Sequence, residues 1–162
     1  MQKEFVKRPE IHLIGISVQT DNATEMDAAK GKIPPSIQRY FSEQLASKIP
    51  DRMKPWTTLC AYGEYESDHN GKYTYFVGEE VAHNAVAPEG FVSHRIPAQR
   101  YVKFTNGPAP MPSVIRDVWF SIWKMTPKEL GGERSFKTDF EVYDERATDH
   151  EKTVLDVYIG LS

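Results

Sequence analysis

The stretch Thr138–Tyr143 contains the residue types best able to do chemistry in this sequence. It reads Thr-Asp-Phe-Glu-Val-Tyr and alternates as a β-strand does, with Phe140 and Val142 on one face. Glu141 and Tyr143 then occupy the other face. A carboxylate on a strand inside a sheet is costly unless it has a partner. Glu141 is therefore either an ordinary surface residue on a solvated face or the charged member of a pocket.

The C-terminal stretch Thr153–Leu161 has a similar pattern and is expected to pair with the first. Its aliphatic residues should pack against helices, and its polar and aromatic residues should share the face of Glu141. The residues expected against helices are Phe140, Val142, Leu155, Val157 and Ile159, and those expected beside Glu141 are Tyr143, Asp156 and Tyr158.

Aromatic rings around one or two carboxylates are an unusual composition for a solvated sheet face. Rings supply contact area and cation–π attraction, and a carboxylate supplies a counter-charge. This combination suits a pocket for a flat, apolar cation. The sequence therefore favours a pocket position for Glu141 over a surface position.

Hydrophobic periodicity predicts the elements that position these residues. One helix begins at Ser36, after two prolines, and ends before Pro50, and a second helix spans Ser113–Lys124. Asn70 and Gly71 mark the turn of a hairpin. The expected extended segments are Phe5–Thr20, Thr57–Tyr65, Tyr73–Val81, Phe91–Thr105 with a break at Pro97, Phe136–Glu145 and Thr153–Leu161, and residues 21–32, 82–90 and 126–135 are expected to be loops.

The order strand, helix, strand, strand occurs twice along the chain. Short patterns support a repeat, because Tyr62–Glu66 and Phe140–Asp144 match in residue type when the two halves are aligned. Phe76–Gly78 and Tyr158–Gly160 match in the same way. Two unrelated hairpins are the alternative. If the halves are related, a pseudo-two-fold axis relates them, and the cleft between such units is a common place for a ligand site.

Several short motifs, in one order along the chain, resemble those of the GyrI-like, AraC-type effector-binding domain family, including its free-standing integron-cassette members. The resemblance covers nearly all of the sequence. The motifs that carry it are Ile14-Gly15-Ile16, Tyr62-Gly63-Glu64-Tyr65, Tyr73–Val81, Trp119–Trp123, Asp139–Tyr143 and Leu155–Gly160.

The resemblance implies an α+β fold in which two pseudo-symmetric β-α-β-β modules form an antiparallel sheet platform with two main helices and a central pocket. It implies a single effector-binding domain over residues 1–162, with an internal repeat of approximately 5–90 and 91–162. In family members that bind lipophilic cations a glutamate sits at the pocket centre, and this role carries over to Glu141. The ligand-binding aromatics that it implies are Trp119, Trp123, Tyr143 and Tyr158, with Tyr40, Tyr65 and Phe76 as further candidates.

The composition argues against several other classes of protein. With 162 residues, a net charge of −3 and no basic block, the chain is not expected to bind nucleic acid directly or an anionic membrane. A single cysteine, Cys60, excludes an intrachain disulfide and fits a reducing, cytoplasmic compartment. No apolar run is long enough to span a membrane. No nucleotide-binding or metal-ligand motif occurs, so we expect no cofactor and no metal site.

Three functions remain open from the sequence. The first is a small-molecule binding module for amphipathic cations, with Glu141 as counter-ion, that senses effectors in transcription regulation. The second is a hydrolase of small electrophiles, in which Glu141 activates a water and Tyr143 or Tyr158 donates to the leaving group. The third is a protein-interaction module, such as a gyrase inhibitor. Because no helix-turn-helix precedes Phe5, we expect a transcriptional role to need a separate DNA-binding or protein partner.

Overall fold

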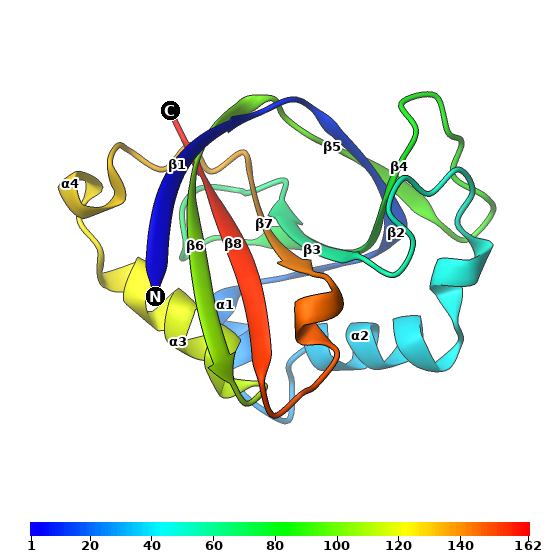
Figure 1. Cartoon of the computed structure of the whole chain (residues 1–162), viewed down its shortest axis with the longest axis horizontal. Helices are drawn as coiled ribbons and strands as arrows, with labels where there is room; N and C mark the ends of the chain where they lie inside the picture. Colours follow the sequence, from blue (N-terminus) through cyan, green and yellow to red (C-terminus); the bar gives the residue numbers. More distant parts are fainter.

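A computed structural model describes residues 1–162 as one antiparallel sheet of eight strands with its main helices on one face (Figure 1). The strands are β1 (Gln2–Arg8), β2 (Ile11–Thr20), β3 (Thr58–Gly63), β4 (Tyr73–Val81), β5 (Val92–Ile96), β6 (Gln99–Ala109), β7 (Thr138–Tyr143) and β8 (Thr153–Leu161). The helices are α1 (Asn22–Met26), α2 (Ile33–Ser42), α3 (Ser113–Lys124) and α4 (Pro127–Leu130), with 3-10 turns η1 (Leu45–Lys48) and η2 (Glu145–Ala147). None of the helices combines the length and the apolar character that crossing a membrane requires.

The strand order, β1-β6-β8-β7-β3-β4-β2-β5, is symmetric about the boundary between β7 and β3. Outward from this boundary, each half carries the two strands of its hairpin and then the strand that precedes its main helix. The outermost strands are β1 on the side of the second half and β5 on the side of the first. The predicted α+β fold, with two β-α-β-β modules in one antiparallel sheet, is confirmed.

Both main helices cover the same face of the sheet, along the lower side of Figure 1. α2 buries Tyr40 among residues of β2 and β4. α3 buries Val114, Val118 and Ile122 against β6 and β8. These three residues are four positions apart, so they form one stripe of the helix. The bounds of α3 agree with the sequence prediction because this stripe is unambiguous.

Several predicted elements differ from the structure. Phe5–Thr20 forms two strands rather than one, because Pro9 between them has no amide hydrogen to donate to a sheet. α2 begins at Ile33, so its two prolines lie in the first helical turn, where amide hydrogens have no helical partner. It also ends earlier than predicted, and η1 follows it. The segments 21–32 and 126–135, predicted as loops, contain α1 and α4. Asp21 caps the start of α1, and Thr126 and Glu129 start α4 with a capping box.

The pairing of β7 with β8 decides which side chains share a face. Phe140 lies opposite Tyr158. Glu141 lies opposite Val157. Directly opposed residues of antiparallel strands point to the same face, so Tyr158 lies with Phe140 on the face away from the helices. Asp156 lies on that face too, because it opposes Val142. The prediction that Asp156 and Tyr158 share the face of Glu141 is wrong.

The helix-covered face holds two apolar clusters, one under α2 and one under α3, and Tyr143 packs against both. Phe140 and Val142 belong to a third cluster on the opposite face, so the prediction that they pack against helices is also wrong. Alternation along a strand defines two faces, but it does not say which face a helix covers. The residues that do lie against the helices as predicted are Leu155, Val157 and Ile159.

The close approach of β2 to β4 at Gly15 provides a test of the sheet. Gly15 lies opposite Gly78, and a Cβ on Gly15 would lie 2.0 Å from the carbonyl oxygen of Val77. Gly15→Ala should lower the free energy of unfolding by about 2 kcal/mol, because the two strands must move apart. Ser17→Ala, at an exposed position of the same strand, should change it by less than about 0.5 kcal/mol. Urea titration measures both, and equal stabilities would contradict the pairing.

Candidate functional site

Glu141 lies in the middle of β7 on the helix-covered face and is only 2% exposed. Its Oε2 accepts hydrogen bonds from the Tyr62 hydroxyl at 2.6 Å and from Trp119 Nε1 at 2.7 Å. Its Oε1 accepts a hydrogen bond from the Tyr143 hydroxyl at 2.8 Å. The three donors come from β3, α3 and β7, so both modules of the fold contribute to one carboxylate.

The sheet register brings these donors together. β3 pairs with β7 so that Cys60 lies opposite Glu141, and Tyr62 follows two residues later on the same face. Tyr143 lies two residues from Glu141 along β7 itself. Trp119 follows the buried Val118 on α3, and its hydrogen bond to Glu141 shows that its indole points from the helix toward the sheet. The site is thus a product of strand pairing and helix packing rather than of one local motif.

Glu141 has no positively charged partner among the ion pairs of the chain. Burial raises the pKa of its carboxyl above the ordinary value of 4.5, and the three hydrogen bonds oppose that rise. Another buried carboxylate on this face does have a cation of the chain beside it, because Arg52 Nη1 lies 3.5 Å from Glu79 Oε2. An ionised Glu141 therefore leaves one negative charge on this face without a cation.

A cavity of about 280 Å³, here called the first cavity, lies beside this carboxylate. Two of the three donors, Tyr62 and Trp119, form part of its wall, and their ring centroids are 5.0 Å apart. Glu141 does not itself line the cavity and lies behind these two rings. The other aromatic residues of the wall are Tyr65, Tyr73, Phe120 and Trp123.

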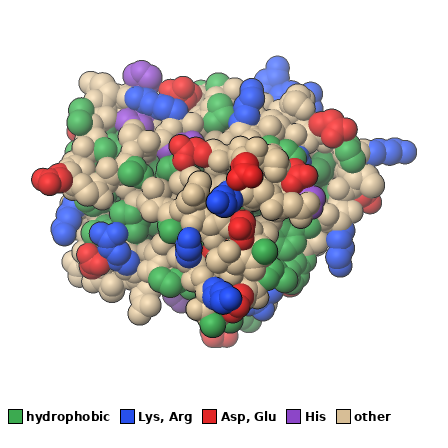
Figure 2. All heavy atoms as spheres, turned by 180° about the vertical axis from the view of Figure 1, so that it is seen from behind, with side chains coloured by type: hydrophobic (Ala, Val, Ile, Leu, Met, Phe, Trp, Pro, Cys, Tyr) green, Lys and Arg blue, Asp and Glu red, His purple; other side chains and the backbone are tan.

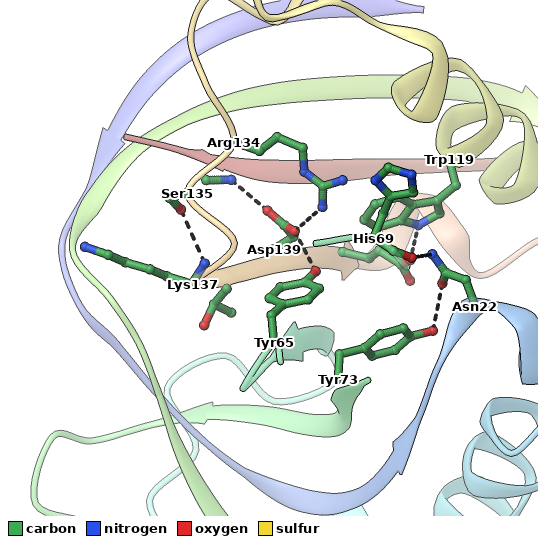
Figure 3. Close-up of polar contacts among 12 residues, drawn as sticks. Asn22, Tyr65, His69, Tyr73, Trp119, Arg134, Ser135, Lys137 and Asp139 are labelled. Atoms are coloured by element: carbon green, nitrogen blue, oxygen red, sulfur yellow. Dashed lines mark hydrogen bonds and ion pairs between the residues drawn. The ribbon is translucent and has the colours of Figure 1, made fainter. Parts of the chain in front are cut away.

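A second network at the edge of the first cavity is centred on Asp139 (Figure 3). Its Oδ2 accepts hydrogen bonds from Arg134 at 2.7 Å and from the Tyr65 hydroxyl at 2.6 Å. Its Oδ1 accepts one from the backbone amide of Gly160 at 2.8 Å. Arg134 also packs over the ring of Phe136, with 4.2 Å between the guanidinium and the ring centroid. Asp139 therefore differs from Glu141 in having its own cation.

The structure distributes most of the predicted ligand-binding residues over three places on the helix-covered face. Trp119, Trp123 and Tyr65 line the first cavity. Tyr143 donates to the carboxylate but lines a different cavity. Tyr40 lies in the apolar cluster beneath α2, where its hydroxyl is buried without a hydrogen-bond partner. Whether any of these residues contacts a ligand stays a prediction.

Phe76 and Tyr158 lie on the opposite face of the sheet, so the expectation that they surround the carboxylate is wrong. Phe76 stacks on His94 with ring centroids 4.2 Å apart, and Tyr158 stacks on Phe140 at 4.5 Å. The guanidinium of Arg8 lies 5.0 Å from the centroid of the Tyr158 ring. The ring predicted to receive an external cation is thus already occupied by a cation of the chain.

Sequence reasoning missed Tyr62 and Tyr73 as residues of the site. The alternation of β3 contained a signal for Tyr62, because Tyr62 and Cys60 share a face and Cys60 opposes Glu141. That signal identifies Tyr62 only when the pairing of β3 with β7 is known. No spacing pointed to Arg134, which reaches Asp139 from the segment after α4.

The remaining surface and side-chain clusters offer less chemistry. Charged side chains of both signs are interspersed over the face shown in Figure 2, without a broad patch of one sign. No group of three or more His, Cys, Asp or Glu side chains is arranged to hold a metal ion. The Glu141 carboxylate and the cavities beside it are therefore the best candidate for a functional site.

Comparison with known proteins identifies sequence relatives. A model of the family described as Cass2, integron-associated effector binding protein, matches residues 4–161. YobU of Bacillus subtilis (strain 168), a protein named for a role in transcriptional regulation, is 26% identical over 147 residues. The match covers 91% of this chain and 89% of YobU.

Two solved structures share the fold. The integron cassette protein VCH_CASS2, from the mobile metagenome of Vibrio cholerae, superposes with a TM-score of 0.77 at 23% identity, over 99% of this chain and 95% of that one. SAV2435, solved bound to tetraphenylphosphonium, superposes with a TM-score of 0.78 at 15% identity, over 100% of this chain and 94% of that one. Identities this low establish similarity of fold.

The raised pKa of Glu141 predicts a pH-dependent stability. A folded-state pKa above the unfolded value means that the contribution of Glu141 is fully present below about pH 4.5 and is lost as pH rises through the folded pKa. Glu141→Gln should remove this loss, because the amide stays neutral and its oxygen still accepts hydrogen bonds. The stability of the variant relative to the unsubstituted protein should therefore increase with pH.

Urea titrations across this pH range measure the effect. Glu89→Gln is the control, because Glu89 is exposed and should leave the pH dependence unchanged. Parallel stability curves for Glu141→Gln and the unsubstituted protein would contradict a raised pKa at Glu141.

Proposed function

The chain belongs to the family of integron-associated effector binding proteins, and we propose that it binds lipophilic aromatic cations in the first cavity, with Glu141 as the counter-charge. One observation carries the proposal. Glu141 is buried, accepts three hydrogen bonds and has no cation of the chain beside it. A positively charged guest would supply the missing charge where protein side chains do not.

A guest in the first cavity would stack on Tyr62 and Trp119 instead of touching Glu141. Both rings donate hydrogen bonds to the carboxylate, which makes their faces more electron-rich and strengthens cation–π attraction. The carboxylate also attracts the cation directly across the ring. Two unit charges about 7 Å apart attract by about 2 kcal/mol at an effective dielectric constant of about 20.

The composition of the cavity wall supports an aromatic guest. Six aromatic residues line a volume of about 280 Å³, close to the lower end of the range of small-molecule pockets. Two arginines also line it, but Arg134 is paired with Asp139 and Arg116 is exposed. The wall also contains the carboxylate of Glu25, which accepts hydrogen bonds from the Thr20 hydroxyl and from the backbone amides of Lys32 and Ile33. The cavity therefore has acidic groups at two places, Glu25 in its wall and Glu141 behind the Tyr62–Trp119 pair.

We further propose that ligand binding serves effector sensing in transcription regulation, in the cytoplasm, together with a separate DNA-binding or protein partner. Two relatives support this direction. SAV2435 was solved with tetraphenylphosphonium, which is a lipophilic aromatic cation, and YobU is named for transcriptional regulation.

A hydrolase mechanism gains no support from the site. The version in which Glu141 activates water while Tyr158 donates to a leaving group needs both side chains on one face, and the register places them on opposite faces. Tyr143 does lie beside Glu141, but its hydroxyl already donates to the carboxylate. The geometry favours binding over turnover.

Replacement of the carboxylate tests the proposal. Glu141→Gln should weaken binding of tetraphenylphosphonium by roughly tenfold to a hundredfold, because the attraction of about 2 kcal/mol between the cation and the carboxylate behind the rings is lost. Glu79→Gln is a matched control, since Glu79 is also buried on the helix-covered face but does not line the cavity. Isothermal titration calorimetry measures all three proteins. Unchanged affinity in Glu141→Gln would refute the role of Glu141 as counter-charge.

The proposed role of Glu141 also predicts that the affinity for tetraphenylphosphonium depends on pH. Tetraphenylphosphonium has no titratable group, so any change in its affinity with pH arises from the protein. Burial raises the pKa of Glu141, and the cation favours its ionised form, so affinity should increase as pH rises through that pKa. Glu141→Gln should flatten the profile. An affinity that is independent of pH in the unsubstituted protein would contradict the expectation.

A further inference from the structure

A second cavity, of about 340 Å³, lies on the other side of the Glu141 carboxylate. Tyr62 and Trp119, the donors to Oε2, line the first cavity, whereas Tyr143, the donor to Oε1, lines the second. Cys60, which opposes Glu141 in the sheet, also lines the second cavity. The carboxylate and its donors therefore form a partition between two separate spaces.

Two large apolar side chains at the mouth of the second cavity are unusually exposed. Trp56 is 83% exposed and Phe41 is 56% exposed, although both line the cavity. Trp56 has a φ of 74°, in the left-handed region that a bulky residue rarely adopts. The guanidinium of Arg52 lies 5.9 Å from the ring centroid of Trp56. The backbone amide of Trp56 interacts with the buried Glu79, which accounts for the local backbone conformation. Packing of the protein interior does not explain the exposure of the indole, whereas a ligand site does.

The charges around the second cavity disfavour an anionic occupant. No Lys or Arg is among the lining residues, whose polar members include Asp144 and His150. Arg146 offsets this charge only in part, because it binds Asp144 at 2.9 Å and Asp156 at 2.7 Å and so serves two carboxylates. Glu141 adds a further acidic group behind Tyr143. An anionic group inside the cavity would meet these carboxylates and would find no Lys or Arg in the lining.

We propose that the second cavity is a binding site for planar aromatic compounds that carry no negative charge and that enter past Phe41 and Trp56. Its volume lies within the range of small-molecule pockets, and seven of its eleven lining residues are hydrophobic. The site is distinct from the first cavity and does not require Glu141 to act as a counter-charge. A ring seated in it contacts Tyr143, and through Tyr143 it adjoins the carboxylate of the proposed cation site.

A pair of fluorescent probes tests the chemistry of the occupant. N-phenyl-1-naphthylamine and 8-anilinonaphthalene-1-sulfonate have one ring system in common and differ by a sulfonate, and both brighten in apolar surroundings. The neutral probe should bind, and the sulfonate should bind at least about tenfold more weakly, because two like charges in a cavity of low dielectric repel. Absence of binding by the neutral probe, or tighter binding of the sulfonate, would overturn the proposal.

Substitutions locate the neutral probe. Trp56→Ala removes an exposed ring without disturbing the core and should weaken binding about fivefold to tenfold, the loss expected for one aromatic pair. Ala147→Phe should fill the second cavity and weaken binding further. Ile115→Phe is the matched control, because Ile115 lines only the first cavity. It should leave this probe unaffected while it weakens tetraphenylphosphonium.

The outcomes separate this site from the proposed function. Loss of the neutral probe in Trp56→Ala and Ala147→Phe, with retention in Ile115→Phe and Glu141→Gln, supports the second site even if tetraphenylphosphonium does not bind at all. Unchanged binding in both Trp56→Ala and Ala147→Phe, or an equal loss in Ile115→Phe, places the probe elsewhere and refutes it.

Discussion

The buried carboxylate of Glu141 is the constraint on which the rest of the structure depends. An ionised group in an apolar interior is tolerated only where hydrogen-bond donors replace water around it. Here the donors come from a strand of each module and from α3, so the two halves must be joined and the helix seated before the group is satisfied. The place of greatest electrostatic cost is thus also the centre of the symmetric sheet, next to the boundary of β3 and β7.

The helix-covered face contains three buried carboxylates, and their surroundings differ in one respect. Asp139 has Arg134 as an ion-pair partner, and Glu79 has Arg52. Glu141, between them in the sheet, has only neutral donors. This difference supports the proposal that Glu141 serves a ligand. Its donors line two cavities, which are the sites proposed for ligands.

Much of the fold could be predicted from local pattern alone. The stripe of Val114, Val118 and Ile122 fixed α3, and the strand patterns fixed the bounds of β4 and β8. The faces could not be assigned in this way, because both faces of β7 and β8 are apolar in part. Which face a helix covers depends on the register of Phe140 against Tyr158, a contact between distant parts of the chain.

The same reasoning explains what was found and missed at the site. Glu141 and Trp119 could be named from residue type and family resemblance, although the position of Glu141 behind the cavity wall could not. Tyr62 was not predicted because its role follows from the pairing of β3 with β7. Arg134 was not predicted because it reaches Asp139 from a loop without a periodic pattern. The predictions for Phe76 and Tyr158 were wrong for the opposite reason, since their residue type was suitable and their face of the sheet was not.

The outer strands of the sheet also have a consequence for the molecule as a whole. β1 comes from the first half of the chain but pairs with β6 of the second half, and β5 comes from the second half but pairs with β2 of the first. The two halves thus exchange their edge strands, and neither half has a complete sheet without the other. The chain should melt as one cooperative body, and a guest held between the halves contributes its binding free energy to the resistance of all of it.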